Sequence, residues 1–198
     1  MSGGGRPSRV ESSRGPLAGL LVLDLSRVLA GPFCTMVLGD LGARVVKVEH
    51  PDGGDVTRGW GPPWEATTGF SAYYLAVNRN KESIALDLAT EAGAQSVRVL
   101  GRRADVLVEN FLPGGLEKLG ISLGELRREN PRLVTASITG SGRIGKEAAL
   151  PGFDLLAQAG AGLRRRRMPQ TAGKERSGDA RCPAGSLPVP SRERFPLR

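Results

Sequence analysis

The run Leu21–Pro51 constrains the fold of this chain more than any other segment. It starts with LVLDL, a short apolar run typical of a strand that is buried on both faces. Gly31-Pro32 opens a predicted helix, because a proline in the first turn loses no intrahelical hydrogen bond. Gly42 fits the C-cap of that helix, and RVVKVE predicts a second strand. The order strand, helix, strand predicts a βαβ unit with two parallel strands.

The predicted helix has apolar residues at three- and four-residue steps, which we expect to form one buried stripe: Phe33, Met36, Val37 and Leu41. Parallel βαβ units bind ligands beyond the carboxyl ends of their strands. Residues 26–31 and Glu49-His50 fall at those ends. We therefore expect a ligand site there.

Strands and helices alternate along the rest of the body. Further strands are predicted over residues 83–88, 105–111 and 133–139. Further helices are predicted over residues 90–104, with Thr90 as N-cap, and over 123–130 and 153–163. A long loop rich in Gly, Pro and aromatic residues spans 52–74, and loops of this length are usually functional. The pattern predicts an α/β fold, a Rossmann-like, mainly parallel sheet with flanking helices.

The net charge of +8 comes mainly from the end of the chain. Residues 17–163 have 15 Lys and Arg against 16 Asp and Glu, whereas residues 164–198 have ten against three. A nucleic-acid-binding domain would place its basic residues on a folded face, so we expect no nucleic-acid partner. Residues 164–198 lack periodicity, and residues 1–16 lack an apolar core, so both segments are predicted to be disordered.

No apolar stretch approaches the roughly 20 residues that cross a bilayer, so we expect no membrane association. The leader is rich in Arg and Ser, as mitochondrial transit segments are, but it shows no amphipathic helix pattern. We expect an intracellular, cytoplasmic protein, with the mitochondrial matrix as the alternative.

Cysteine and histidine are too rare for a disulfide framework, a clustered metal site or most nucleophile–base pairs. The chain has two cysteines, and we expect Cys34 to be a small buried residue. His50 is the only histidine and has no nucleophile near it in the sequence. We interpret His50 as a loop residue that contacts ligand or solvent.

Residues Gly140–Gly145 match the spacing G-x-G-x-x-G and nearly match a P-loop. A dinucleotide site also needs a full helix directly afterwards, and a P-loop needs Ser or Thr after Lys146. Pro151 would interrupt the helix that a dinucleotide site needs, and the residue after Lys146 is Glu147 rather than Ser or Thr. We favour a flexible glycine-rich loop beside a site, and a nucleotide-binding module remains an alternative.

Three other segments have side chains suited to ligand chemistry. Asn80 and Lys81 suit a phosphate or another polar ligand arm, although on this pattern alone a solvated turn is favoured. Asn110 and Phe111 end the predicted strand 105–111 and suit an amide and a flat ring, with a capped strand end as the equally favoured alternative. Asp154 opens a helix, where carboxylates are usually caps but can also be covalent nucleophiles.

Taken together, these segments resemble the class III CoA-transferases, a superfamily that includes formyl-CoA transferases and alpha-methylacyl-CoA racemases. The similarity covers residues 18–163 in order and spacing. It lies in LDLSRVLAGPFCTMVLGDLGARVVKVE, GDVTRGWGPP, YYLAVNRNKESIALDL, ADVLVENFLPGGLEKLG, NPRLVTASITGSG and PGFDLLAQA. The stretch around residues 56–88 is most similar to the branch that moves CoA from succinyl-CoA to a dicarboxylic acid such as glutarate.

The resemblance implies that Asp154 attacks an acyl-CoA and that CoA passes through an aspartyl-CoA thioester to a small carboxylic or dicarboxylic acid. It implies no permanently bound cofactor, with the CoA thioester as substrate. The related racemases have a histidine before this aspartate, and this chain has Phe153 there. Without that proton carrier, transfer is favoured over racemisation.

The resemblance also implies which residues contact CoA. Matched by motif, they are Leu29, Ala30, His50, Asn80, Lys81, Asn110, Phe111 and Lys118. Basic groups among them suit the CoA phosphates, and Phe111 suits the adenine or the pantetheine arm.

Family members are about twice as long, and the resemblance implies that two chains interlock as a homodimer. We divide this chain into a leader (1–16), the N-terminal CoA-transferase domain (17–163) and a tail unlike the family (164–198). We expect the fold to be incomplete relative to the family, so that this chain alone does not close the dimer and has little turnover. A non-catalytic CoA-binding or regulatory fragment is the main alternative.

Overall fold

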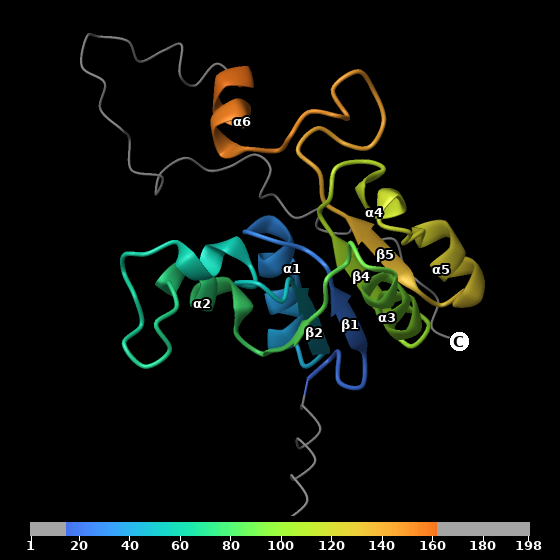
Figure 1. Cartoon of the computed structure of the whole chain (residues 1–198), viewed down its shortest axis with the longest axis horizontal. Helices are drawn as coiled ribbons and strands as arrows, with labels where there is room; N and C mark the ends of the chain where they lie inside the picture. Colours follow the sequence, from blue (N-terminus) through green and yellow to red (C-terminus); the bar gives the residue numbers. More distant parts are fainter. Residues whose placement is uncertain (1–14, 162–198) are drawn as a thin grey trace, which may run out of the picture. The chain divides into compact units, whose positions relative to one another are not determined.

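Five strands form a single parallel sheet in the computed structural model, which describes residues 15–161 (Figure 1). They are β1 (Leu21–Asp24), β2 (Arg44–Glu49), β3 (Lys81–Ala85), β4 (Val106–Glu109) and β5 (Val134–Ser137). Their order across the sheet is β3-β2-β1-β4-β5, and every neighbouring pair is parallel. The predicted α/β fold with a parallel sheet is confirmed. The predictions for residues 1–14 and 162–198 lie outside the described residues.

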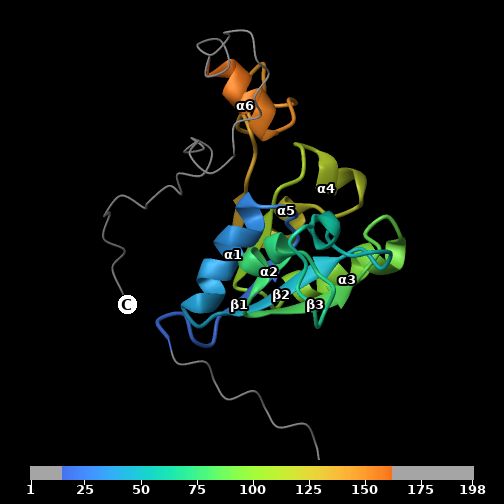
Figure 2. The same ribbon diagram turned by 90° about the vertical axis from the view of Figure 1, so that its left-hand side faces the viewer.

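Helices cover both faces of the sheet. Helix α1 (Ala30–Asp40) packs on one face and also contacts α2 (Ala72–Asn78), and both lie on the same side in Figure 2. Helices α3 (Glu91–Gly101), α4 (Gly115–Lys118) and α5 (Leu123–Glu129) lie on the other face (Figure 1). The short helix η1 (Val56–Gly59) precedes α2.

The main hydrophobic core lies between the sheet and helices α3 to α5. Its most buried members come from β1, β4, the three helices and the loops between them: Leu23, Leu25, Ala94, Val97, Ala104, Leu107, Leu116, Ile121 and Leu126. A smaller core lies under α1 and contains Val22, Val45 and Val108. Successive residues of a strand point to opposite faces, so each strand contributes to both cores.

The helix α1 confirms the predicted boundaries but not the predicted buried stripe. Gly42 follows the helix with φ +101°, as a C-cap glycine does. Phe33 and Leu41, however, are 42% and 40% exposed. The buried residues of α1 are Gly31, Pro32, Thr35 and Met36. A Cβ at Gly31 would lie 2.1 Å from that of Ser26, so the helix packs through its small residues, which lets it approach the end of β1.

The predicted helix beginning after Thr90 is confirmed, with the Thr90 hydroxyl accepting a 3.1 Å hydrogen bond from the amide of Gly93. Strand β3 starts two residues earlier than predicted, at Lys81. Helix α2 lies partly inside the segment predicted as a long loop, and its start is capped by Ser71. The short helices η1 and α4 are not predicted from the sequence.

Residues 139–161 form a second unit, which is described separately from residues 15–138. It contains α6 (Asp154–Gly160), none of whose residues is buried. Among residues 15–161, no helix combines the length and apolar content needed to span a bilayer.

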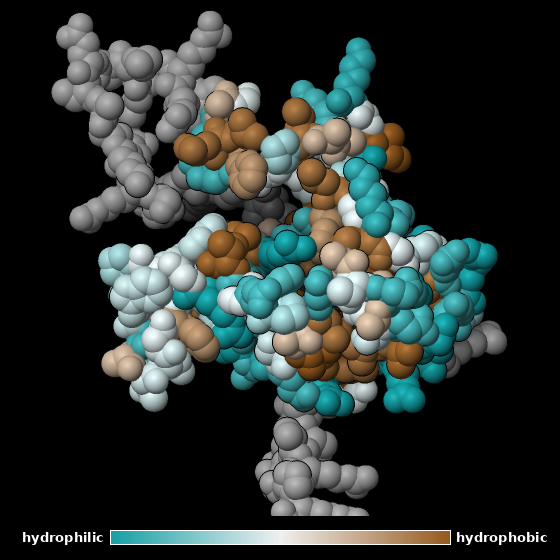
Figure 3. All heavy atoms as spheres, in the orientation of Figure 1, coloured by the Kyte–Doolittle hydropathy of each residue, from teal (hydrophilic) through white to brown (hydrophobic). Residues whose placement is uncertain are grey.

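Hydrophobic side chains also reach the surface of the first unit, where Figure 3 shows them among hydrophilic ones. The more exposed of these are Leu29, Val56, Trp60, Trp64, Leu112 and Val134. Val134 is 61% exposed because β5 is an edge strand, paired only with β4.

Candidate active site

A pocket of about 240 Å³ opens beyond the carboxyl ends of β1 and β2. Its aliphatic part consists of Leu25, Val48, Leu86, Leu88 and Leu119. Its charged part consists of Arg27, Lys47, Glu49, His50, Asp55 and Asp87. The volume is below the usual 300–1,000 Å³ of small-molecule sites, so the pocket fits a fragment of a large ligand.

The loop between β1 and α1 is held by the buried carboxylate of Asp24. One oxygen of Asp24 accepts hydrogen bonds from the amide and the hydroxyl of Ser26. The other accepts from the Thr35 hydroxyl at 2.6 Å and lies 3.2 Å from the ammonium of Lys81. Every one of these groups is buried or nearly so, so the carboxylate is desolvated but fully hydrogen-bonded.

A second buried ion pair holds the same loop from the β2 side. The Lys47 ammonium lies 3.0 Å from Asp55 and donates a 2.8 Å hydrogen bond to the Ser26 carbonyl. Asp55 also accepts from the amide of Val28 at 3.2 Å. Val28 has φ +70°, which is unfavourable for a β-branched residue, and the Asp55 contact helps to hold it there. Burial opposes ionisation of Asp55, but Lys47 and Thr57 lower its pKa overall.

Glu49, at the end of β2, anchors the loop that follows. Its carboxylate accepts two hydrogen bonds from Arg58, at 2.7 and 2.8 Å, and one each from Tyr74 and Ser83. It also accepts from the amide of Asp55 at 2.8 Å. Burial alone would raise the pKa of Glu49, but these hydrogen bonds outweigh it and lower the pKa to about 2.

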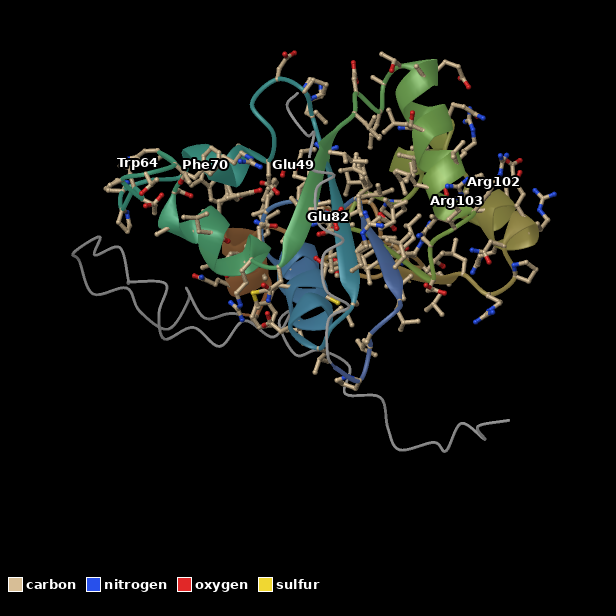
Figure 4. All side chains as sticks on the ribbon, turned by 90° about the horizontal axis from the view of Figure 1, so that it is seen from below. Glu49, Trp64, Phe70, Glu82, Arg102 and Arg103 are labelled. Atoms are coloured by element: carbon tan, nitrogen blue, oxygen red, sulfur yellow. The ribbon has the colours of Figure 1, made fainter. Side chains whose placement is uncertain are left out.

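Arg58 links this carboxylate to the aromatic loop. Its guanidinium lies 4.4 Å from the ring centre of Phe70 and 4.1 Å from that of Tyr74. Figure 4 shows Glu49 between the loop that contains Phe70 and the strands of the sheet. The loop predicted to be functional is thus fixed to β2 through one ion pair and two cation–π contacts.

His50 is the one predicted CoA contact that lines the pocket itself. Its Nδ1 accepts a 3.1 Å hydrogen bond from the amide of Asp52, and its Nε2 lies 3.8 Å from Asp87. The side chain is 52% exposed. The interpretation of His50 as a loop residue open to ligand and solvent agrees with this position.

Asn110 and Phe111 follow β4 and both contact Arg27. The Asn110 side chain accepts from the Arg27 amide at 2.9 Å and donates to the Arg27 carbonyl at 2.8 Å. The Arg27 guanidinium lies 4.6 Å from the ring centre of Phe111. Asn110 and Phe111 therefore do not line the pocket themselves but contact Arg27, which does.

Leu29 and Ala30 stand at the start of α1, and both are exposed. Lys118 is exposed at the end of α4, directly before the pocket residue Leu119. None of these three side chains lines the pocket, and their contact with CoA stays a prediction.

Asn80 and Lys81 lie at the amino end of β3, and neither residue lines the pocket. The Asn80 amide donates a 2.7 Å hydrogen bond to Asp40. The Lys81 ammonium is buried beneath α1, where it donates to the Pro32 carbonyl at 2.8 Å and to Asn78 at 2.9 Å. Burial lowers the pKa of Lys81 to about 8, against the opposing effect of Asp24. A role of these residues in ligand binding also stays a prediction.

Asp154 lies in the second unit, in the first turn of α6, as the sequence predicts. Its side chain is exposed and accepts a 2.7 Å hydrogen bond from Gln158. In the same unit no helix follows Gly145 directly, since α6 does not begin until Asp154. The glycine segment therefore lacks the helix N-terminus that dinucleotide sites and P-loops use, and the nucleotide-binding alternative is wrong for it.

Within residues 15–161, no three His, Cys, Asp or Glu side chains gather as metal ligands. Cys34 is only partly buried, which differs from the expectation of a buried residue. Burial and the neighbouring Asp24 raise the pKa of its thiol, although Lys81 opposes them. Cys34 is therefore a poor nucleophile at neutral pH.

Comparison with known proteins identifies the family. Residues 17–179 match CoA-transferase family III. The chain belongs to CoA-transferase family III.

Two relatives of this chain are succinyl-CoA:glutarate CoA-transferase of Mus musculus, 47% identical over 80% of this chain, and succinate–glutarate CoA-transferase of Agrobacterium fabrum, 49% identical over 75%. This chain covers 36% and 38% of their respective lengths. A crystal structure of a CAIB/BAIF family protein from Brucella suis superimposes with a TM-score of 0.72 at 45% identity, over 81% of this chain and 44% of that one.

Arg27 and Glu49 fall in the segments predicted to border a ligand, but no role of their side chains is predicted from the sequence, and Asp24 and Lys47 are missed altogether. Asp24, Lys47 and Glu49 do have a signal in the sequence, because they alternate with apolar residues inside two strands. With a period of two, Lys47 and Glu49 share one face with Val45, and Asp24 shares that face with Val22. No comparable pattern marks Arg27.

Proposed function

We propose that this chain is the CoA-binding part of a CoA-transferase that moves CoA from a succinyl-CoA-like donor to a small carboxylic or dicarboxylic acid. The observation that supports this most is the pocket beyond β1 and β2, with its aliphatic and charged parts, in a chain 47% identical to a succinyl-CoA:glutarate CoA-transferase. An acyl-CoA combines apolar groups with phosphates, and the pocket has partners for both.

In the proposed reaction, the Asp154 carboxylate attacks the thioester carbonyl and expels the CoA thiolate, which gives a mixed anhydride. The thiolate then attacks the Asp154 carbonyl of the anhydride, forms an aspartyl-CoA thioester and releases the donor acid. The acceptor carboxylate and CoA repeat the two steps in reverse, so that Asp154 is regenerated. Each step exchanges one acyl bond for another and needs no further reactant.

We expect this chain alone to have little turnover. Asp154 is exposed, and no residue of α6 is buried. An anhydride formed at an exposed carboxylate is open to hydrolysis, because closed sites protect such intermediates by excluding water. The second candidate function, a CoA-binding chain without catalysis, is favoured by the same exposure.

The test is to incubate the chain with succinyl-CoA, add hydroxylamine, and map the product by peptide mass spectrometry. Hydroxylamine converts an aspartyl thioester or anhydride into a stable hydroxamate. We expect the hydroxamate at Asp154, its loss in Asp154→Asn, and its retention in Glu147→Gln, a matched exposed carboxylate of the same unit. Binding of CoA without the hydroxamate would support the non-catalytic function. Absence of CoA binding would contradict both.

A further inference from the structure

The pocket contains three acidic side chains, and all three are already engaged. Glu49 is bound to Arg58, Tyr74 and Ser83, and Asp55 to Lys47 and Thr57. Asp87 accepts a 2.9 Å hydrogen bond from the amide of Ala89 and faces His50. These carboxylates stabilise the walls of the pocket and leave its cations to determine which ligand it accepts.

Of the pocket's cations, Lys47 is not available to a ligand. Its ammonium is 1% exposed and is held by Asp55 and the Ser26 carbonyl. Such a buried pair is costly to separate, because each charge would be left without a partner in a low-dielectric environment.

Arg27 differs from Lys47 in every one of these respects. The residue is exposed, and across residues 15–161 its guanidinium makes no hydrogen bond and no ion pair. Within the described part of the chain, its guanidinium carbon lies over the ring of Phe111, 4.6 Å from the ring centre. A guanidinium stacked on a ring keeps its N–H donors free in its own plane, where they can bind two oxygens of one anion.

The main chain of Arg27, by contrast, is held in place on both sides. The side-chain amide of Asn110 accepts a hydrogen bond from the backbone N–H of Arg27 and donates one to the backbone carbonyl of Arg27. The preceding residue, Ser26, is buried and bonded to Asp24 and Lys47. The following residue, Val28, is bonded to Asp55. The site is therefore preorganised at the backbone and open at the guanidinium.

We propose that Arg27 binds a phosphate of the CoA substrate, and that the side chains of Asn110 and Phe111 are positioning groups that hold Arg27. The inference rests on the proposed CoA-binding function. A phosphate fits better than the carboxylate of the small acid, because the same pocket has an aliphatic part that suits a nucleotide base. The small dicarboxylic acid has little apolar surface to place against that part.

The experiment measures binding of CoA, 3′-dephospho-CoA and pantetheine to the full chain by calorimetry. In Arg27→Ala we expect the affinity for CoA to fall by about ten- to a hundredfold, the range for losing hydrogen bonds to a charged group. Pantetheine has no 3′-phosphate or diphosphate, so its binding should not change. If Arg27→Ala weakens the binding of CoA but not of 3′-dephospho-CoA, Arg27 binds the 3′-phosphate. If it weakens the binding of both, Arg27 binds the diphosphate.

Arg103→Ala is the matched control, because Arg103 is an exposed arginine after α3, at the opposite end of the sheet from the pocket (Figure 4). It should bind CoA as the unaltered chain does. Asn110→Ala should weaken CoA binding by several-fold, and the double variant with Arg27→Ala should bind no more weakly than Arg27→Ala alone. Such non-additivity is expected of a positioning residue and not of an independent contact.

The inference is overturned if Arg27→Ala binds CoA normally, if Arg103→Ala weakens CoA binding equally, or if pantetheine binding falls in parallel. It is also overturned if Arg27→Ala weakens the binding of succinate or glutarate but not of CoA. If the unaltered chain binds no CoA, the proposed function itself fails. That outcome is distinct from CoA binding that does not depend on Arg27.

Discussion

Helices α3 and α5 cover one face of the sheet over aliphatic side chains, whereas α1 covers the other face over two kinds of residue. Beneath α1, the amino halves of the strands contribute valines such as Val22 and Val45. The carboxyl ends of the same strands contribute Asp24, Lys47 and Glu49. The face beneath α3 stays aliphatic up to Leu25 and Val48.

The difference indicates that one face of the sheet mainly stabilises the fold and that the other mainly positions the pocket. The aliphatic face stabilises the sheet by burying apolar surface, a non-directional effect. The charged groups under α1 stabilise less, because desolvation offsets their attraction, but each one orients a specific backbone group. Those backbone groups belong to Ser26, Val28 and Asp55, which lie in the pocket lining or directly next to it.

The largest effect is expected from Lys47→Met, which would leave Asp55 buried without its cation. Removing one partner of a buried pair lowers the free energy of unfolding by about 3–5 kcal/mol. Urea unfolding of the single variant and of Lys47→Met with Asp55→Asn measures this. The double variant should recover part of the loss, because no buried charge remains unpaired. A single variant as stable as the unaltered chain would show that this pair is not desolvated as described.

A comparable loss is expected on the aliphatic face, from Leu107→Ala. Leu107 of β4 is fully buried in the core beneath helices α3 to α5, and removing such a side chain costs about 2–5 kcal/mol. Because no charge is involved, the loss should be the same at pH 7 and pH 4. The folded protein should still bind CoA, since Leu107 does not line the pocket. A CoA affinity that falls more in Leu107→Ala than in Lys47→Met would contradict the division between the faces.

The elements of the fold could largely be predicted from the sequence, because their signals are local. Gly42 and Thr90 mark helix ends, and the apolar runs around Leu23 and Leu107 mark strands. The buried face of α1 could not be predicted in the same way. It depends on how closely Gly31 approaches Ser26, which is a property of two segments packed together.

The site shows the same limit. His50 could be placed at the pocket because its position at the end of β2 follows from strand boundaries. Lys81 could not be placed, because its long side chain carries the charge from the amino end of β3 to Asp24 on β1. The contact of Asn110 with Arg27 joins residues 83 apart in the sequence, and spacing alone does not reveal it.

Glu49→Gln tests whether the charged groups act through ionisation. The pKa of Glu49 is lowered to about 2 from 4.5, so its ionised form contributes roughly 3 kcal/mol of stability above pH 4.5. This contribution is lost as the pH falls from 4.5 towards 2. The difference in stability between the unaltered chain and Glu49→Gln should therefore be largest at pH 7 and shrink at pH 3.

Glu65→Gln is the matched control for Glu49. Its pKa is also lowered to about 2, by hydrogen bonds from Thr67 and Thr68, but Glu65 lies at the surface, only partly buried, and solvent screens its carboxylate. Its effect on stability at pH 7 should be much smaller than that of Glu49→Gln. A difference between Glu49→Gln and the unaltered chain that does not change with pH would mean that Glu49 acts through packing.

The smallest effect is expected from Thr90→Ala, at the N-terminus of α3. The Thr90 hydroxyl accepts from the Gly93 amide and donates to the Asp87 carbonyl at 2.8 Å, so it ties the helix to the pocket residue Asp87. Losing such a cap costs about 1 kcal/mol, and Thr90→Ser should keep most of it. Thermal unfolding of the two variants measures the cap. The aliphatic core holds α3 in place without this cap, so the affinity for CoA should be unchanged in both variants. An affinity for CoA that falls in Thr90→Ala alone would show that this face of the sheet also positions the pocket.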